Sequence, residues 1–259
     1  MGFGIKRKDK TMDTKDVTSI HVGNADIQKI VVGGGIVWQG NTVPGPTTLR
    51  GGNLQAGFYG ECPTSEFITG DELAKMIGLT AGTSQYSNEP WLKFSYLGKV
   101  EFVAKKPFRH SISWTNINAV NAVFGNRTVE IKGKTYKVRL MKGKTEGKQN
   151  DYLSPSGDIC KGSEWNKLML PIHKNAPSSW KYHNNVSSPT ANWNVGYKNA
   201  DLVTHYDNGE GSYSWCQEYG SNRDNRLRRG GQGVSYSPYY SPSDTRPHNG
   251  WRPVLELLE

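Results

Sequence analysis

The sequence has few aliphatic side chains, and this shortage excludes several classes of protein. Hydrophobic residues make up only 35% of the 259 residues, against roughly 45–50% in ordinary soluble domains. No apolar run approaches the roughly 20 residues of a membrane-spanning helix. The basic start of the chain is followed by no apolar segment, so it does not resemble a secretory signal. We therefore expect no helical bundle, no membrane insertion and no secretory signal.

Cysteine and clustered histidine are also scarce. The three cysteines, Cys62, Cys160 and Cys216, lie 98 and 56 residues apart, a spacing that fits neither a disulfide framework nor a CxxC metal site. The six histidines include no HxxxH or HExxH pair, and no Gly-x-Ser-x-Gly elbow is present. We expect idle thiols in a reducing cytosol, no metal and no cofactor.

Glycine, proline and aromatic residues are abundant instead. The chain has 30 Gly, 13 Pro and 28 aromatic residues. Turn-forming residues and rigid flat side chains favour strands and ordered loops, and aromatic content on this scale argues against disorder. The composition therefore predicts an α+β fold that is rich in β-strand.

The net charge of +9 comes without a motif typical of nucleic-acid-binding proteins. Most lysines alternate with glutamate, which is typical of a solvated surface. We expect no nucleic-acid partner, and attraction to acidic polymers such as teichoic or other anionic surface glycans remains open. The two basic clusters are Lys6, Arg7, Lys8 and Lys10 at the start, and Arg223, Arg226, Arg228 and Arg229 near the end.

A segment rich in Pro and Gly at 42–48 predicts a linker between two modules. Residues 1–41 form a small β-rich module, and residues 49–259 form a large one. Three glycines at 33–35 precede neither a helix nor a Lys-Ser/Thr pair, so we interpret them as a hairpin turn rather than a phosphate-binding loop. The predicted strands of the small module are 17–22, 27–32 and 35–38.

Two short helices are predicted in the large module. The first begins at a capping box formed by Thr69 and Glu72 and stops at Gly78. The second covers 114–124, with Ser113 or Thr115 as its cap and Gly125 as its terminator. Their apolar faces would consist of Leu73, Met76 and Ile77 in the first helix and of Ile117, Val120 and Phe124 in the second.

Residues 128–140 predict a β-hairpin. A two-residue loop of Gly133 and Lys134 suits a type II′ turn. We expect the alternating Lys, Glu and Arg to line a face turned toward solvent. The apolar face would pair Ile131 with Tyr136, and Val129 with Val138.

The region 180–251 differs from the rest of the chain. Its 72 residues hold 12 Trp or Tyr and only 6 Val, Leu, Ile or Met. This region is too polar for regular strands throughout and too aromatic for a linker, so we predict long ordered loops, which usually carry function. An apolar segment at 251–258 follows and predicts a last strand within a sheet.

Several motifs resemble those of tailed-bacteriophage proteins. IHVGN at 20–24, DIQKI at 26–30 and VW at 37–38 resemble a short β-repeat at the start of many tail-associated proteins. The large module looks like a domain that recurs in phage virion proteins and prophage genes. The motifs that it shares are KVEFVAK at 99–105, GSEWN at 162–166 and GWRPVLEL at 250–257.

A second resemblance concerns the fold. RRGG at 228–231 and GWR at 250–252 are similar to the end of C-type-lectin-like domains of the formylglycine-generating-enzyme class, where two such strands flank a variable loop. Some phage receptor-binding proteins vary that loop, and 222–249 has a matching Asn, Ser, Tyr, Asp and Gly bias. The cysteines that bind copper in those enzymes are missing from this chain. The Glu-Pro-Asn and Trp-Asn-Asp calcium motifs of sugar-binding animal lectins are missing too, because the third residue is Trp91 in the first and Val195 in the second. The resemblance therefore implies neither oxidase chemistry nor calcium.

Together these features predict a non-enzymatic virion protein, made in the host cytoplasm, that acts as a tail-associated adhesin. Residues 1–41 would bind other virion tail proteins, and the aromatic loops would bind a bacterial surface glycan or protein. We expect a homo-oligomer, with a trimer favoured, because repetition turns weak contacts into avidity.

Flat rings stack on sugar faces while Asn, Asp and Arg satisfy hydroxyl groups. Among the aromatic residues we expect Trp193, Trp215 and Trp251 to be buried and the pair Tyr239 and Tyr240 to be exposed. The candidate receptor-binding residues are Trp180, Tyr182, Tyr197, Tyr206, Tyr213, Tyr219, Asn222, Arg223, Arg226, Tyr236, Tyr239 and Tyr240.

Two other functions stay open. The first is a purely structural tail, neck or capsid-decorating protein whose aromatic loops contact neighbouring subunits. The second is a cell-wall glycan hydrolase that uses Glu210 and Glu218 as paired carboxylates. The acidic residues at 207–210 lack the later ligands of a calcium-binding loop, so we interpret them as a turn.

Overall fold

The chain divides into two compact units, Met1–Val43 and Pro44–Glu259, and the division lies within the predicted linker. The structure is a computed structural model. It confirms an α+β fold with much strand and little helix. No helix in the described ranges is long and apolar enough to span a membrane. Those ranges are 20–22, 25–27, 29–32, 35–39, 43–144, 162–174, 193, 195–219 and 224–258.

The small unit contains two hairpins rather than the predicted three strands. Strand β1 (Ile20–Val22) pairs with β2 (Ala25–Ile27), and β3 (Lys29–Val32) pairs with β4 (Gly35–Gln39). The second pairing sets Val32 opposite Gly35, which confirms a hairpin at the triple glycine. Strand β2 was missed because Ala and Asp, its first two residues, have low β-propensity.

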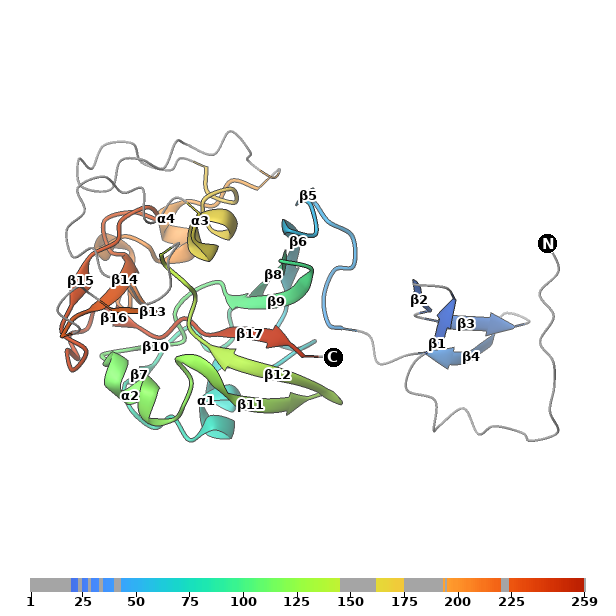
Figure 1. Cartoon of the computed structure of the whole chain (residues 1–259), viewed down its shortest axis with the longest axis horizontal. Coiled ribbons are helices and arrows are strands. Elements are labelled where there is room, and N and C mark those ends of the chain that lie inside the picture. The colour runs from blue at the N-terminus through green and yellow to red at the C-terminus, as the bar shows by residue number, and fades with distance from the viewer. Residues whose placement is uncertain are drawn as a thin grey trace. The chain divides into compact units, whose positions relative to one another are not determined.

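An antiparallel seven-stranded sheet forms the centre of the large unit (Figure 1), in the order β11-β12-β17-β9-β8-β6-β5. The closing strand β17 lies inside it, between β12 and β9, as predicted. The bounds are β5 (Gly51–Gly52), β6 (Ala56–Cys62), β8 (Trp91–Tyr96), β9 (Lys99–Ala104), β11 (Phe124–Ile131), β12 (Lys134–Arg139) and β17 (Val254–Leu257).

Both faces of this sheet are covered. Helix α3 (Glu164–Leu168) contacts β6 and β8, and its Trp165 belongs to the main apolar cluster with Phe94 and Val103. On the opposite face, Phe67 packs on Phe102 and Tyr136, with ring centroids 4.3 and 5.2 Å apart. Successive side chains of a strand point to opposite faces, so a sheet buried on both sides loses a simple alternating pattern.

The hairpin of β11 and β12 confirms the predicted face and corrects the turn. Lys132 and Gly133 have φ values of 50° and 74°, and two positive values are typical of a type I′ turn. The loop therefore begins one residue earlier than predicted. It sets Val129 opposite Tyr136, two residues from the predicted partner. The four apolar residues remain buried together because a shift of two residues keeps the face.

Arg139 contradicts the prediction of a solvent-facing polar side. It is buried, and its guanidinium lies 2.5 Å from Glu101, 2.9 Å from Glu164 and 3.0 Å from Glu256. Glu101 and Glu256 are directly opposite on β9 and β17, an arrangement that destabilises a sheet without a cation between the two charges. Burial, followed by the nearby Glu164, raises the pKa of Glu101 well above its ordinary value.

Helix α1 (Gly70–Ile77) confirms the predicted caps. Thr69 and Glu72 form the reciprocal capping box, and Gly78 ends the helix at a φ of 75°. Leu73 is buried as expected. Met76, however, is 43% exposed, so its place in the predicted apolar stripe was wrong.

Helix α2 (Trp114–Ala119) is shorter than predicted. Its cap is Ser113, one of the two candidates. The helix stops early because Asn121 adopts a left-handed φ of 61°, a position that asparagine tolerates. The expected terminator, Gly125, lies in β11 instead. Helices α3 and α4 (Asn199–Leu202) were not predicted.

A second, four-stranded sheet lies within the region predicted to be loops. Its order is β15-β14-β13-β16, and β13 and β16 run parallel. The loop prediction was wrong here because the strands bury polar side chains such as Ser214, Gln217 and Arg229. The bounds are β13 (Tyr213–Tyr219), β14 (Arg226–Gly230), β15 (Tyr239–Tyr240) and β16 (Asn249–Gly250). A smaller sheet pairs β7 (Thr83–Ser84) with β10 (Arg109–His110).

Candidate functional site

The two central strands of the four-stranded sheet present different side chains on their two faces. Arg228 pairs across the sheet with Trp215, and the next residue along β14 is Arg229. Because side chains alternate along a strand, these two arginines point to opposite faces. We call the face of Arg229 the inner face and the face of Arg228 the outer face.

On the inner face, Arg229 belongs to the interior of the unit. One terminal amine donates to Asn166 Oδ1 at 2.5 Å, and the other donates to the Gly143 carbonyl at 3.3 Å. The guanidinium also lies 5.7 Å from the centroid of the Trp165 ring. These contacts make Arg229 part of the packing between β14 and α3.

Arg252 lies against the same ring, 5.8 Å from its centroid. Its guanidinium donates to Ser214 Oγ at 2.9 Å and to the carbonyls of Ala104, Lys105 and Leu202. Burial lowers the pKa of Arg252 to about 9. The motifs GSEWN, RRGG and GWR thus meet around one tryptophan, so their shared role is structural.

On the outer face, Arg228 lies between two tyrosine rings. Its guanidinium is 4.4 Å from the centroid of Tyr213 and 4.3 Å from that of Tyr240. One terminal amine donates to Asn249 Oδ1 at 2.5 Å. Only 7% of Arg228 is exposed. Burial lowers its pKa to about 10, and Tyr213 and Asp244 act in the opposite direction.

Arg246 adds a second cation beside the same ring. Its guanidinium lies 4.4 Å from the centroid of Tyr240, and its Nε is 3.3 Å from Asp244 Oδ1. The other oxygen of Asp244 is 3.9 Å from Arg228 and accepts a hydrogen bond from Asn249 at 2.8 Å. Two guanidinium groups therefore share one carboxylate.

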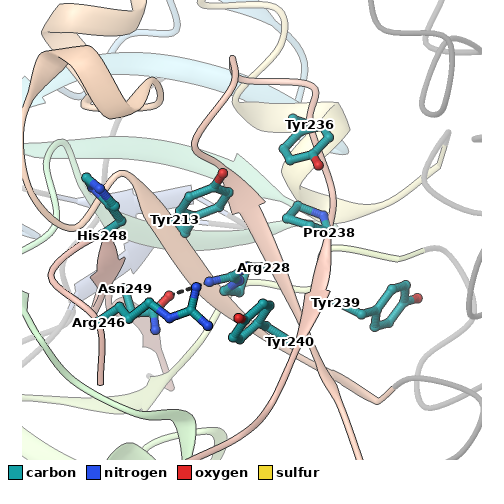
Figure 2. Close-up of a pocket in the computed structure, with 9 residues that line it drawn as sticks. All are labelled: Tyr213, Arg228, Tyr236, Pro238, Tyr239, Tyr240, Arg246, His248 and Asn249. Carbon is teal, nitrogen blue, oxygen red and sulfur yellow. Dashed lines mark hydrogen bonds between the residues drawn. The ribbon is translucent and has the colours of Figure 1, made fainter. Parts of the chain in front are cut away.

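These side chains enclose a cavity of about 410 Å³ (Figure 2). Figure 2 shows Tyr213, Tyr240 and Arg246 around Arg228, whereas the ring of Tyr239 points away from it. The lining residues are Tyr213, Arg228, Tyr236, Pro238, Tyr239, Tyr240, Arg246, His248 and Asn249. An adjoining cavity of about 470 Å³ is lined by Asn225, Tyr239, Tyr240, Ser241, Ser243, Asp244 and Arg246.

The structure brings four of the predicted binding residues to this cavity, namely Tyr213, Tyr236, Tyr239 and Tyr240. Tyr239 and Tyr240 are partly buried, so the expectation that they are exposed was wrong. Tyr240 is covered by two guanidinium groups, which explains its burial. The prediction did not include Arg228, the first residue of RRGG, or Arg246, His248 and Asn249, which lie between RRGG and GWR in the segment that holds the tyrosine pair.

Other predicted binding residues lie elsewhere. Tyr219 and Arg226 form a separate cluster with Trp114, in which the guanidinium is 4.2 and 4.4 Å from the two ring centroids. Tyr206, 47% exposed, stacks on the His205 ring. Tyr197 donates to Glu61 and packs against the main apolar cluster. Four others lie outside the described residues: Trp180, Tyr182, Asn222 and Arg223.

Two of the three tryptophans expected in the core are there. Trp215 and Trp251 are buried, and their neighbours include the four-stranded sheet. Trp193 is only partly buried, which corrects the third prediction. Its ring packs beside Gly51, where a Cβ atom would lie within 2.3 Å of the Trp193 side chain.

Glu210 and Glu218, the carboxylates of the hydrolase alternative, lie in different surroundings. Glu218 lies toward the end of β13 and is buried, whereas Glu210 precedes β13 and lies 3.5 Å from His248. Burial raises the pKa of Glu218 to about 7, whereas hydrogen bonds from the backbone amides of Gly143 and Lys144 act to lower it.

The thiols fit the sequence prediction where they are described. Cys62 and Cys216 are buried and take part in no disulfide, and burial raises the pKa of Cys62 to about 12. Cys160 lies outside the described residues. Among the residues that are described, no group of three His, Cys, Asp or Glu side chains has the arrangement of a metal site.

Comparisons of the chain with protein-family models, with curated proteins and with solved structures found no match. The cavity and the sequence motifs are therefore the features of the chain that bear on its function. The cavity brings together four of the predicted binding residues, Tyr213, Tyr236, Tyr239 and Tyr240.

Proposed function

We propose that the protein is a non-enzymatic virion protein of a tailed phage, an adhesin that binds a bacterial surface glycan through its large unit. The observation that carries the binding function is the cavity on the outer face, which gathers Tyr213, Tyr236 and Tyr240 around Arg228. The motifs at 20–24, 26–30 and 37–38 support the assignment to a phage tail.

The chemistry of the two cavities suits a polar ligand. Binding pockets for small ligands have volumes of roughly 300–1,000 Å³, and each of the two cavities falls in that range. Aromatic rings provide apolar surface, while guanidinium, amide and hydroxyl groups bond to polar atoms. In the adjoining cavity the amide comes from Asn225, the hydroxyl groups come from Ser241 and Ser243, and the guanidinium comes from Arg246.

The arrangement of the last strands supports a C-type-lectin-like end for the large unit. The RRGG segment lies largely in β14, and β16 precedes Trp251 in the GWR segment; β13 lies between them in the same sheet. The connection between these strands supplies most of the cavity lining. In this proposal the small unit anchors the protein to other tail proteins, and copies of the chain form a homo-oligomer.

The test is binding of the full chain to an array of purified bacterial surface polysaccharides. Tyr240→Ala should weaken binding by roughly tenfold or more, as expected for a central aromatic contact. The matched control is Tyr59→Ala, which removes another half-buried tyrosine from β6, outside the cavity. Thermal unfolding of both variants separates a lost contact from a lost fold.

The opposite outcomes point to the other functions. Absence of binding to every polysaccharide, with Tyr240 protected between subunits in intact virions, would identify a structural virion protein. Release of reducing sugar from cell-wall glycan would identify a hydrolase. Equal binding by Tyr240→Ala and Tyr59→Ala would show that the cavity is not the glycan site.

A further inference from the structure

We infer that the cavity selects an acidic glycan, whose phosphate or carboxylate group binds beside Arg228 and Arg246. This inference rests on the proposed function and names the chemical class of its ligand. The cavity charge, the free donors of Arg246 and the occupied tyrosine rings support it.

The described residues that line the two cavities carry more positive than negative charge. Arg228 and Arg246 are permanent cations, and Asp244 is the one carboxylate among the lining residues. His248 also lines the cavity, and Glu210, which lies 3.5 Å from it, is not among the lining residues. The cavity therefore has a net positive charge that a ligand anion would neutralise.

Arg228 is buried without a counter-charge of its own. Its Nε is buried and has no hydrogen-bond acceptor among the described residues. Its nearest described carboxylate, Asp244, is 3.9 Å away and lies closer to Arg246. A buried cation with incomplete partners is costly, so an anion in the adjacent cavity would be stabilised by it.

Arg246 supplies the direct donors. Its side chain is 62% exposed, and Nε faces Asp244. No described residue accepts a hydrogen bond from its terminal amines, so these two groups are available to a ligand. A planar guanidinium binds phosphate and carboxylate through two parallel hydrogen bonds, which a neutral sugar hydroxyl does not match.

The tyrosine rings are already partly occupied. Arg228 lies over both Tyr213 and Tyr240, and Arg246 lies over Tyr240 as well. These guanidinium groups cover ring surface on which a neutral sugar would stack. Selection by charge is therefore better supported than selection by stacking alone.

The experiment measures binding of the full chain to three probes by calorimetry: poly(glycerol phosphate), polygalacturonate and dextran. At least one of the two charged polymers should bind, dextran should bind roughly tenfold more weakly or worse, and added salt should weaken the charged binding. The two charged probes separate a phosphate ligand from a carboxylate ligand.

Two substitutions at one position locate the effect. Arg246→Gln should weaken binding of the charged probe by roughly tenfold or more, the loss expected for a charge-assisted pair. Arg246→Lys keeps the charge and should retain part of the binding. The control, Lys75→Gln, removes one exposed positive charge from α1 and should leave binding unchanged.

The outcomes distinguish this inference from the proposed function. Equal binding of dextran and the charged polymers, or equal behaviour of Arg246→Gln and Lys75→Gln, would overturn the inference. If the polysaccharide array still showed binding that depends on Tyr240, the adhesin proposal would stand without it. Absence of binding to all three probes and to the array would contradict both.

Discussion

Each face of the four-stranded sheet buries one arginine of β14, and the two arginines make different contacts. On the inner face, both terminal amines of Arg229 donate to protein acceptors, and its guanidinium lies beside Trp165. On the outer face, Arg228 has one hydrogen bond to Asn249, two flanking tyrosine rings and a share of one carboxylate. Both leave Nε without an acceptor among the described residues.

This difference separates structural burial from burial at a binding site. The inner arginine completes contacts between elements that are distant in sequence, so its removal should affect the fold first. The outer arginine lies beside a cavity of about 410 Å³ and an exposed second cation, so its removal should affect ligand binding more than folding.

The largest expected effect tests the inner face. Arg229→Met removes both hydrogen bonds and leaves Asn166 Oδ1 and the Gly143 carbonyl without these donors. Each buried polar group that loses its partner costs about 1–3 kcal/mol, so the free energy of unfolding should fall by about 3 kcal/mol. Urea denaturation measures it. A loss below about 1 kcal/mol would show that Arg229 is not part of the framework.

A second test of the inner face uses pH. The pKa of Glu218 in the folded chain is about 7, above its ordinary value of 4.5. The folded state therefore binds a proton more tightly than the unfolded state, and this stabilisation is present below pH 4.5 and lost as the pH rises through 7. For this fully buried group it amounts to about 3 kcal/mol.

Glu218→Gln should remove this pH dependence. Urea denaturation at pH 5 and pH 8 gives the change in unfolding free energy for each variant, and the change should be smaller by about 3 kcal/mol in Glu218→Gln. Other buried carboxyl groups such as Glu101 contribute the same pH dependence to both proteins, so only the difference between variants is informative. The control is Glu130→Gln, which makes the same substitution at an exposed position on β11. An unchanged pH dependence would contradict the raised pKa.

Local signals allowed much of the large unit to be predicted from sequence. The capping box of α1 and the apolar face of the hairpin depend on residues close together in the chain, and both are confirmed. The closing strand was also predicted, because its apolar run is long enough to mark a buried strand. The turn type was predicted wrongly because it depends on the positive φ of Lys132, which the sequence did not indicate.

Long-range polar contacts could not be predicted in the same way. Arg139 is buried because glutamates from β9, α3 and β17 converge on it, and no local pattern connects these elements. The strand β13 was missed for a similar reason, since it buries Gln217 and Glu218 in place of aliphatic residues.

The candidate site was predicted in part. Aromatic content alone selected Tyr213, Tyr236, Tyr239 and Tyr240, which line the cavity, and also Tyr197 and Tyr219, which pack elsewhere. Arg228 was noted only as a member of a basic cluster and of the RRGG motif, and Arg246 was not singled out. The role of Arg228 depends on the face of β14 that it occupies, which strand register sets, and Arg246 reaches the same cavity from the connection between β15 and β16.

On the outer face, Arg228→Met should change the stability of the chain less than the other two substitutions do. Arg228→Met removes the contacts with Tyr213 and Tyr240, each worth roughly 0.5–2 kcal/mol, and one hydrogen bond to Asn249. It also removes the cost of burying a cation whose pKa is lowered to about 10. These terms oppose each other, so the net loss of stability should be only about 1 kcal/mol.

The comparison fails if the two arginines behave alike. Urea denaturation of Arg228→Met and Arg229→Met in parallel measures the difference, and binding of a charged polysaccharide measures the second property. We expect Arg228→Met to fold and to lose binding. If Arg228→Met lost as much stability as Arg229→Met, Arg228 would be part of the structural framework. An arginine that serves ligand binding contributes little to folding, because the cost of burying its charge offsets its contacts.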